Sequence, residues 1–233
     1  IADYLSVIDE KLSLLEEKKT ELSRYKKSMM QKLFSQEIRF KDENGNDFSD
    51  WKLVLLKDLF DYKNGKSFEN SLDEKGSYFL ISLNSIDING ELKKNHKRLN
   101  FSDGSLKKSD LIMVLSDVAH GNFLGLSAII PDDNFVLNQR MAALKPITNN
   151  SVQFIRYIIN FNQKYFKLKG QGSSQLNLSK SDVENFKFKL PEFSEQQKIA
   201  NFLSAIDESI DKVNEQINET KSFKKAMLQQ MFV

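Results

Sequence analysis

The sequence predicts an α+β protein, in which one mixed, mostly-β domain is flanked by two long helices that form an antiparallel coiled coil. A helical segment at residues 1–34 occurs again at residues 199–232, and neither copy contains Gly or Pro. The stretch between the copies consists of short apolar runs separated by turn residues. We therefore expect a first helix at 1–36, the mostly-β domain at 37–192 and a second helix at 193–233.

The two helical copies align without a gap. Identical residues in the first copy include Ile1, Ala2, Leu5, Ser6, Ile8, Asp9, Glu10, Lys26, Lys27, Met29, Gln31 and Phe34. The two copies are separated by a whole domain, so the repeat period is far longer than that of a solenoid protein. Because the first helix ends where the β domain begins and the second starts where that domain ends, helices that pair within the chain run antiparallel.

Both copies carry one apolar stripe at spacings of three and four residues, which needs a partner to bury it. The stripe consists of Leu5, Ile8, Leu12, Leu15, Leu22 and Met29 in the first copy, and of Leu203, Ile206, Ile210, Val213, Ile217 and Met227 in the second. An apolar stripe by itself indicates only that this face of the helix is buried in a core. The duplication favours pairing of the two stripes with each other. Polar seam residues, which lower stability and fix register, are Lys19, Lys26, Thr220 and Lys224.

Elements of the intervening domain follow from apolar runs between turn signals such as Asn44-Gly45. We expect strands at 78–83, 111–115, 126–130, 142–144 and 186–191, and a helix at 151–166 that packs on the sheet. Trp51, the only tryptophan, is expected to be an anchor either in the core or at the seam between domains. Ser194, followed by Gln197, predicts an N-cap with a capping box for the second long helix.

Composition bounds the function classes. The 233 residues include no cysteine, which excludes a disulfide framework and a thiolate metal site and fits a reducing cytoplasm. No apolar run approaches the roughly 18 residues of a membrane span, so no membrane partner is expected. The net charge of +2 is too small to indicate nucleic acid by itself. Basic residues nevertheless cluster locally, in the runs 93–98 and 164–169.

Three stretches carry a resemblance to a known family. They are Leu190-Pro191 with Glu195–Ala200, Leu203, Ile206-Asp207 and Ile210; the loop Gly172–Ser179; and Gln31–Phe40 followed by Trp51. In combination they resemble the specificity subunits of type I restriction–modification systems, over essentially the whole chain. A full subunit of that family has two target recognition domains. This chain has one such domain and begins with Ile, so it resembles the C-terminal half of a specificity subunit.

The resemblance implies a non-catalytic bacterial subunit that reads one half of a bipartite target in double-stranded DNA. The helices are then the spacer and the docking site for methylation subunits, and through them for restriction subunits. It implies no cofactor on this chain: S-adenosylmethionine, ATP and Mg²⁺ are expected on the partner subunits. A homodimer of half-subunits in the cytoplasm would supply both recognition domains.

Candidate DNA contacts are the Lys, Arg, Asn, Gln, Ser and His side chains of the loops, because these types suit phosphates and the edges of guanine and adenine. They are Lys63, Asn64, Lys66, Ser67, Lys93, Lys94, His96, Lys97, Arg98, Ser116, His120, Asn122, Gln139, Arg140, Lys169, Gln171 and Ser173. For each lysine alone, a solvated surface charge is the ordinary interpretation. Gln175 and Asn177 are expected to bond the late loop to a helix rather than to DNA.

Two other functions stay open. The first is a regulatory protein that binds methylation subunits without DNA specificity. The second is a Mg²⁺-dependent nuclease, since Asp87, Glu91 and Lys93 have suitable residue types, although Asn89-Gly90 between the carboxylates favours a solvated hairpin. No zinc site is expected from His96 and His120, and neither a Gly-rich cofactor motif nor a methyltransferase tetrapeptide occurs.

Overall fold

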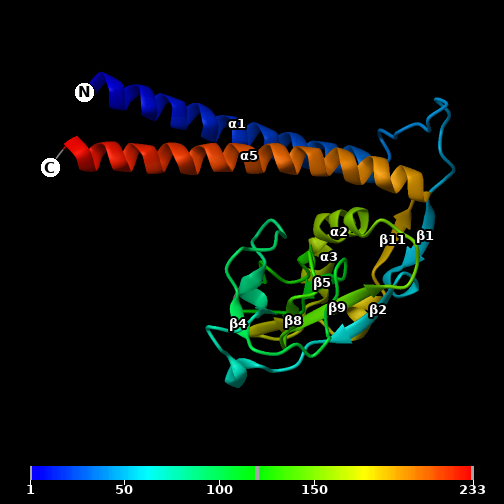
Figure 1. The fold of residues 1–233 in the computed structure, drawn as a ribbon. Coiled ribbons are helices and arrows are strands. Elements are labelled where there is room, and N and C mark those ends of the chain that lie inside the picture. Colours follow the sequence, from blue (N-terminus) through cyan, green and yellow to red (C-terminus); the bar gives the residue numbers. More distant parts are fainter. Residues whose placement is uncertain (1, 119–120, 232–233) are drawn as a thin grey trace. The chain divides into compact units, whose positions relative to one another are not determined.

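The structure is a computed structural model that describes residues 2–118 and 121–231 (Figure 1). It divides into two compact units: Ile1–Phe40 with Lys198–Val233, and Lys41–Gln197. Among the described residues, no helix is long and apolar enough to cross a membrane.

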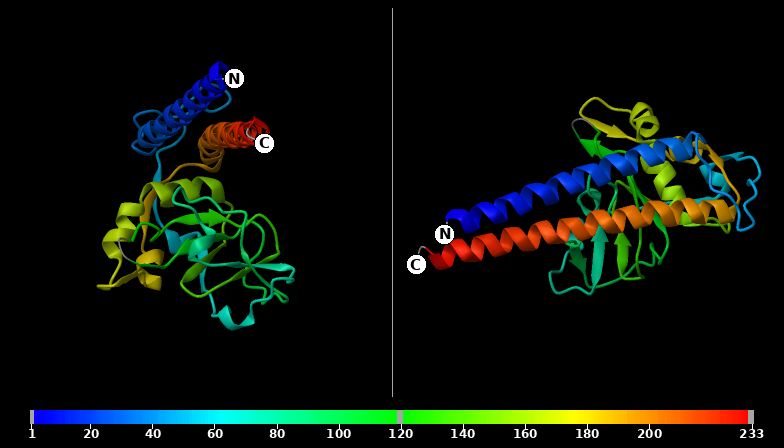
Figure 2. Two further views of the ribbon diagram at one scale, coloured as in Figure 1. Left: turned by 90° about the vertical axis from the view of Figure 1, so that its left-hand side faces the viewer. Right: turned by 90° about the horizontal axis from the view of Figure 1, so that it is seen from above.

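The first unit is a pair of antiparallel helices, α1 (Ala2–Phe34) and α5 (Phe193–Met231), which lie side by side in every view (Figures 1 and 2). Uninterrupted helix is possible because neither segment contains Gly or Pro. The apolar stripes meet as predicted: Ile8, Leu203, Ile206, Val213 and Ile217 are buried. The other stripe residues, which are Leu5, Leu12, Leu15, Leu22, Met29, Ile210 and Met227, are half-buried.

Two ion pairs between the helices are copies of each other. Lys26 bonds to Asp207, and Lys224 bonds to Asp9. Asp9 and Asp207 occupy equivalent positions of the repeat, and so do Lys26 and Lys224. The helix pair therefore has an approximate two-fold axis, and the duplicated sequence specifies both the antiparallel direction and the register.

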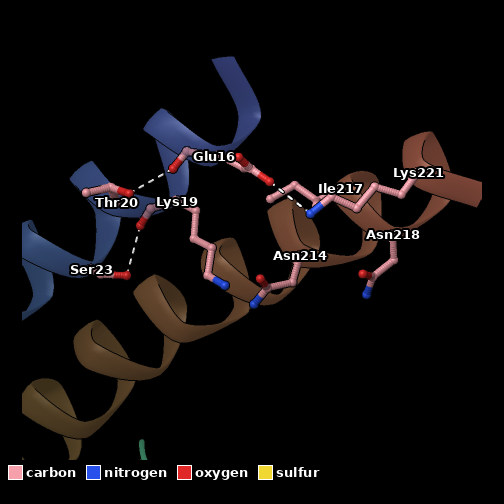
Figure 3. A pocket seen from close by; sticks show the side chains of 8 residues that line it. All are labelled: Glu16, Lys19, Thr20, Ser23, Asn214, Ile217, Asn218 and Lys221. Carbon is pink, nitrogen blue, oxygen red and sulfur yellow. Dashed lines mark hydrogen bonds and ion pairs between the residues drawn. The ribbon is translucent and has the colours of Figure 1, made fainter. Parts of the chain in front are cut away.

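The remaining polar seam residues behave differently from one another. A polar groove between the helices is lined by Glu16, Lys19, Thr20, Ser23, Asn214, Ile217, Asn218 and Lys221 (Figure 3). Lys19 is exposed there rather than buried in the seam, and Lys221 Nζ donates to Glu16 Oε1 over 2.9 Å. Thr220 is buried, but its hydroxyl donates to Gln216 O in its own helix. Among the four predicted polar seam residues, Lys26 and Lys224 form the ion pairs to the other helix.

The second unit is built from short strands in small sheets. A four-stranded antiparallel sheet has the order β2-β9-β5-β7, and a three-stranded sheet has the order β4-β3-β8, in which β3 and β8 are parallel. Two ribbons, β1-β11 and β6-β10, complete it. The strands are β1 (Lys52–Leu55), β2 (Phe60–Asn64), β3 (Tyr78–Ile81), β4 (Lys97–Leu99), β5 (Leu111–Val114), β6 (Ser116–Val118), β7 (Ser127–Ile129), β8 (Phe135–Leu137), β9 (Met141–Pro146), β10 (Gln175–Asn177) and β11 (Lys187–Leu190).

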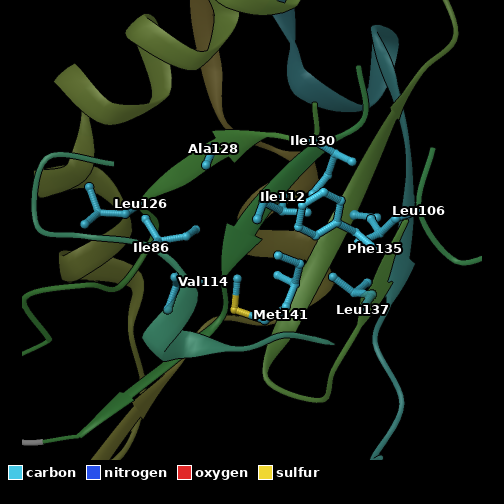
Figure 4. Close-up of a cluster of buried hydrophobic side chains, with 12 residues drawn as sticks. Ile86, Leu106, Ile112, Val114, Leu126, Ala128, Ile130, Phe135, Leu137 and Met141 are labelled. Carbon is cyan, nitrogen blue, oxygen red and sulfur yellow. The ribbon is translucent and has the colours of Figure 1, made fainter. Parts of the chain in front are cut away.

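The main core of this unit is formed by both larger sheets (Figure 4). Ile112, Val114 and Met141 come from the four-stranded sheet, and Ile81 and Leu137 from the three-stranded sheet. These strands are buried on both faces, which explains why they read as continuous apolar runs rather than alternating ones. Helix α2 (Val152–Phe161) buries its apolar face in the same unit.

Three sequence expectations about the elements change in detail. The helix expected at 151–166 is two helices, α2 and α3 (Gln163–Lys169), because the Asn162 side chain donates to Ile158 O and ends the first. A further short helix, α4, spans Lys180–Glu184. The strand expected at 126–130 is limited to β7. Ser194 is not the N-cap of α5, because that helix begins at Phe193 and Ser194 lies in its first turn.

The chain entering and leaving this unit is anchored by buried polar side chains. Trp51 is a core residue as predicted: it packs edge-on against Phe154, and its Nε1 donates to Glu195 Oε2 over 3.0 Å. Gln196 is also buried, and its amide donates to Pro191 O and accepts from the Ser151 backbone N–H.

Candidate nucleic-acid interface

A tight turn at residues 138–140 forms the centre of the candidate surface. It joins β8 to β9, two strands that are buried over most of their length. Asn138 is 2% exposed, and its amide accepts from the Phe68 N–H over 3.2 Å and donates to Glu69 Oε1 over 2.8 Å. Gln139 and Arg140 are exposed.

Main-chain hydrogen bonds bring three other segments of the chain to this turn. Gly65 N–H donates to Met141 O over 3.0 Å, and Leu115 N–H donates to Arg140 O over 2.9 Å. Leu178 N–H in turn donates to Leu115 O over 2.8 Å. The segments around Gly65, Leu115 and Leu178, which are far apart in sequence and adjoin predicted contact loops, therefore lie beside the turn or beside one another.

Glu69 connects the basic run of residues 93–98 to the same turn. Lys97 Nζ forms an ion pair with Glu69 Oε2 at 2.9 Å, while the other oxygen accepts from Asn138. The hydrogen bonds from Lys97 and Asn138 hold the pKa of the Glu69 carboxyl below its usual value, and the charge of Arg140 adds to this effect. Segments within or next to the five predicted contact loops are thus connected to this turn by hydrogen bonds.

Most of the predicted contact residues are exposed. They are Asn64, Lys66, Ser67, Lys93, Lys94, Lys97, Arg98, Asn122, Gln139, Arg140, Lys169, Gln171 and Ser173. Lys63 is half-buried at the end of β2. His120 lies outside the described residues.

Several of the exposed side chains are also engaged within the protein. The guanidinium of Arg98 lies 4.9 Å from the Phe79 ring centroid and donates to Gly76 O. Asn122 accepts from Lys167 over 3.5 Å through its side chain. Asn64 accepts from the Tyr62 hydroxyl, whose pKa burial raises to about 12.

Ser116 was wrongly placed among the DNA contacts. It is 4% exposed, because it begins β6, where it pairs with Asn177 of β10. Its hydroxyl donates to Asn177 Oδ1 over 2.7 Å and accepts from Gln175 Nε2. Gln175 and Asn177 are structural, as expected, but they bond the late loop to a strand and not to a helix.

His96 is half-buried, unlike its basic neighbours. Its ring packs against Phe79 and Phe135, with centroid separations of 5.8 and 5.6 Å. Burial lowers the pKa of the imidazole, although a hydrogen bond with the Lys93 backbone acts in the opposite direction. Near neutral pH the ring is therefore a neutral packing element rather than a cation for phosphate.

The carboxylates that suggested a nuclease belong to a hairpin. Asp87 N–H donates to Glu91 O, and the Asp87 carboxylate accepts from the backbone N–H groups of Asn89 and Glu91. Glu91 forms an ion pair with the buried Arg156 at 2.8 Å. Within the described part of the chain, no group of three or more His, Cys, Asp and Glu side chains is placed to hold a metal ion.

Sequence reasoning missed Glu69 and the anchoring role of Asn138. An acidic residue is not an expected member of a DNA-contacting surface, and no pattern links Glu69 to Asn138 or Lys97 along the chain. Gly65 gives an indirect indication that its loop lies against the turn at Asn138. A Cβ there would lie 1.8 Å from Asn138 O, so the loop and the turn approach at backbone distance.

Comparison with known proteins shows which family this chain belongs to. Residues 48–221 match the family described as type I restriction modification DNA specificity domain. The MjaVIII specificity subunit of a type I restriction enzyme from Methanocaldococcus jannaschii is 26% identical over 241 residues, covering 95% of this chain and 56% of that protein. The HindI specificity subunit from Haemophilus influenzae is 27% identical over 202 residues, covering 79% and 41%.

Solved structures show the same fold. The S subunit of a type I restriction–modification system from M. genitalium superimposes with a TM-score of 0.67 at 20% identity, over 97% of this chain and 58% of that one. The HsdS subunit from Thermoanaerobacter tengcongensis gives 0.63 at 15% identity, over 98% and 55%. The chain spans about half the length of the relatives that it matches.

Proposed function

Because this chain belongs to the family of type I restriction modification DNA specificity domains, we propose that it reads one half of a two-part sequence in double-stranded DNA. The observation that carries the proposal is that hydrogen bonds connect the turn at residues 138–140 to segments within or next to four other loops, which bear exposed Lys, Arg, Asn and Gln side chains. Base edges in the major groove carry sequence information, and these side chains match guanine and adenine.

The exposed lysines of the surface have a separate role in this proposal. Lys66, Lys93 and Lys94 are exposed cations that suit phosphate oxygens, which fix the position of the protein on the duplex without reading sequence. Their contribution falls as salt rises, because each neutralised phosphate releases counterions.

The helix pair acts as the spacer and as the docking site for methylation subunits. A helix of 33 residues, the length of α1, is about 50 Å long, comparable to about 15 base pairs of DNA. Tyr25 and Phe223 occupy equivalent positions of the repeat and are both about half exposed. The two rings are related by the approximate two-fold axis of the helix pair, and this arrangement suits two copies of one partner.

The chain itself performs no catalysis in this proposal. The matched relatives are named specificity subunits of restriction enzymes. Methylation subunits would supply S-adenosylmethionine and the adenine chemistry, and restriction subunits would supply ATP-dependent translocation and cleavage with Mg²⁺.

Methylome sequencing tests the central proposal. Cells carrying the matching methylation subunit, with and without this gene, should differ by one methylated motif. The double variant Lys93→Ala/Lys94→Ala should methylate the same motif less completely. A partner-binding regulatory protein would instead retain methylation subunits in a pulldown and change no motif, and that outcome would exclude the DNA-reading function.

We propose further that two copies of the chain associate, so that each supplies one recognition domain for a two-part target. Val7 and Leu14, one heptad apart on α1, are 60% and 58% exposed and provide an apolar face for helix–helix contact. Light scattering of the purified chain at micromolar concentration should give twice the 26.9 kDa chain mass. A stable monomer at that concentration contradicts this step and leaves the DNA-reading proposal intact.

A further inference from the structure

Arg140 has an unusual backbone conformation. Its φ is +69°, in the left-handed region that Gly occupies freely and Asn adopts with little penalty. Other L-residues pay roughly 1–2 kcal/mol there. Local stability would therefore favour Gly or Asn at this turn. Gln36 and Ser109 also have positive φ, so what distinguishes Arg140 is its position on the candidate surface.

The backbone of Arg140 is held on both sides. Its carbonyl accepts from Leu115 N–H over 2.9 Å, and the carbonyl of the next residue, Met141, accepts from Gly65 N–H over 3.0 Å. Two residues earlier, Asn138 N–H donates to Ile81 O in β3. The turn is thereby fixed to three neighbouring segments, each continuous with the buried core.

The side chain of Arg140 is exposed by contrast. Among residues 2–118 and 121–231 its guanidinium has no hydrogen bond or ion pair, and its charge acts on the Glu69 carboxyl only as a minor electrostatic interaction. Lys97, which lies on the same surface, has its charge taken up by Glu69. Arg140 thus presents five unused N–H donors from a rigid base in the middle of the candidate interface.

We propose that Arg140 is a specificity-determining residue that reads the O6 and N7 edge of one guanine in the major groove. This inference rests on the proposed function. A planar guanidinium bonds guanine through two parallel hydrogen bonds, and rigid support makes that geometry discriminating. Asn138 and Glu69 are positioning residues, because their hydrogen bond joins the turn to the loop at 66–69.

The contribution of Arg140 differs from that of the lysines in kind. A lost phosphate contact weakens binding to all sequences about equally. A lost bidentate contact to guanine lowers the preference for that base by roughly 5- to 150-fold and leaves the other positions unchanged. The two roles are therefore separable in one binding experiment.

The test is selection from a randomised duplex library with the full purified chain. Wild type should enrich a motif that contains guanine at a fixed position. Arg140→Gly should enrich the same motif with that single position degenerate, and Arg140→Lys should keep the overall affinity while the guanine preference falls. Lys94→Ala is the matched control, which should weaken binding and keep the whole motif.

Thermal unfolding separates this role from a structural one. Arg140→Gly relieves the left-handed backbone and should melt at the same temperature as wild type or above it. An unchanged motif with Arg140→Gly overturns the inference, as does a loss at every position together with a lower melting temperature. Enrichment of no motif by wild type would overturn the proposed function itself.

Discussion

The Lys26–Asp207 ion pair should stabilise the helix pair more than its repeat-equivalent, Lys224–Asp9. The side chains of Lys26 and Asp207 are 19% and 22% exposed, whereas those of Lys224 and Asp9 are 29% and 54% exposed. The repeat therefore supplies one interaction in two environments. The substitutions Asp207→Asn and Asp9→Asn are identical in chemistry, and they remove the carboxylate from a more buried and a more exposed copy of the same ion pair.

The magnitudes follow from that difference. Removing one partner of a fully buried pair costs about 3–5 kcal/mol, and exposed pairs contribute about 0–1 kcal/mol. A pair about one-fifth exposed lies between these limits, so Asp207→Asn should cost about 2–3 kcal/mol. Asp9→Asn, next to a half-exposed carboxylate, should cost about 1 kcal/mol or less.

Urea unfolding followed by circular dichroism at 222 nm measures both variants. That signal reports mainly on the helix pair, because α1 and α5 contain 33 and 39 residues while α2 contains 10. Lys26→Met combined with Asp207→Leu should recover much of the lost stability, since a packed apolar pair removes the unpaired buried charge. The double-mutant cycle isolates the coupling from other contacts of the two residues.

Equal losses from Asp207→Asn and Asp9→Asn would refute the reasoning, because burial would then not control the contribution. Failure of the apolar double variant to recover stability would have the same consequence. It would mean that the side chains act through contacts other than their ion pair.

Three other perturbations test the second unit, Lys41–Gln197. Trp51→Phe should cost about 1–3 kcal/mol in urea unfolding, because it removes an indole donor from the buried Glu195. Gly65→Ala should cost about 3 kcal/mol in the same measurement, since a Cβ would lie 1.8 Å from Asn138 O. Burial lowers the pKa of His96 from 6.5, so the unfolded chain binds more protons and stability should fall as pH drops below about 6.5; His96→Gln should reduce this slope between pH 7.5 and 5.5.

Two of these perturbations have a matched control, and the third has a refuting outcome. Leu53→Ala changes a side chain that is 58% exposed and should leave unfolding nearly unchanged, in contrast to Trp51→Phe. Gly104→Ala should cost only about 1 kcal/mol, for the left-handed backbone, because nothing lies within 4 Å of a Cβ there. The proposed basis of the pH dependence is wrong if His96→Gln leaves the slope between pH 7.5 and 5.5 unchanged.

The helices were predictable because a helix is a local structure with a local code. The absence of Gly and Pro, the three-four spacing of Ile8, Leu203 and their neighbours, and the duplication together determined length, buried face and direction. Even the polar seam positions Lys26 and Lys224 were identifiable. What the sequence did not show was their partners, since Asp9 and Asp207 lie outside the stripe.

The candidate interface was predictable by residue type and only partly by position. Exposed cations and amides in turn-rich loops are a compositional pattern, and most of them are on the surface. The exposure of Ser116 was not predictable, because the exposure of a residue after a buried strand depends on which strand pairs with it. Ser194 failed because the start of a helix depends on the tertiary contacts of its first turn, where Glu195 and Gln196 are buried.

The sequence by itself determined that two equivalent helices bracket one mostly-β domain and that the helices pair with each other. Only the tertiary structure decided that segments next to distant loops are hydrogen-bonded to the turn at residues 138–140 and that Glu69 joins Asn138 to Lys97. It also decided that Arg140 is held in a left-handed turn, where its side chain makes no hydrogen bond or ion pair among the described residues. Periodicity along a chain encodes which face of an element is buried. Contacts between distant loops depend on strand order and on backbone approach, which no local pattern records.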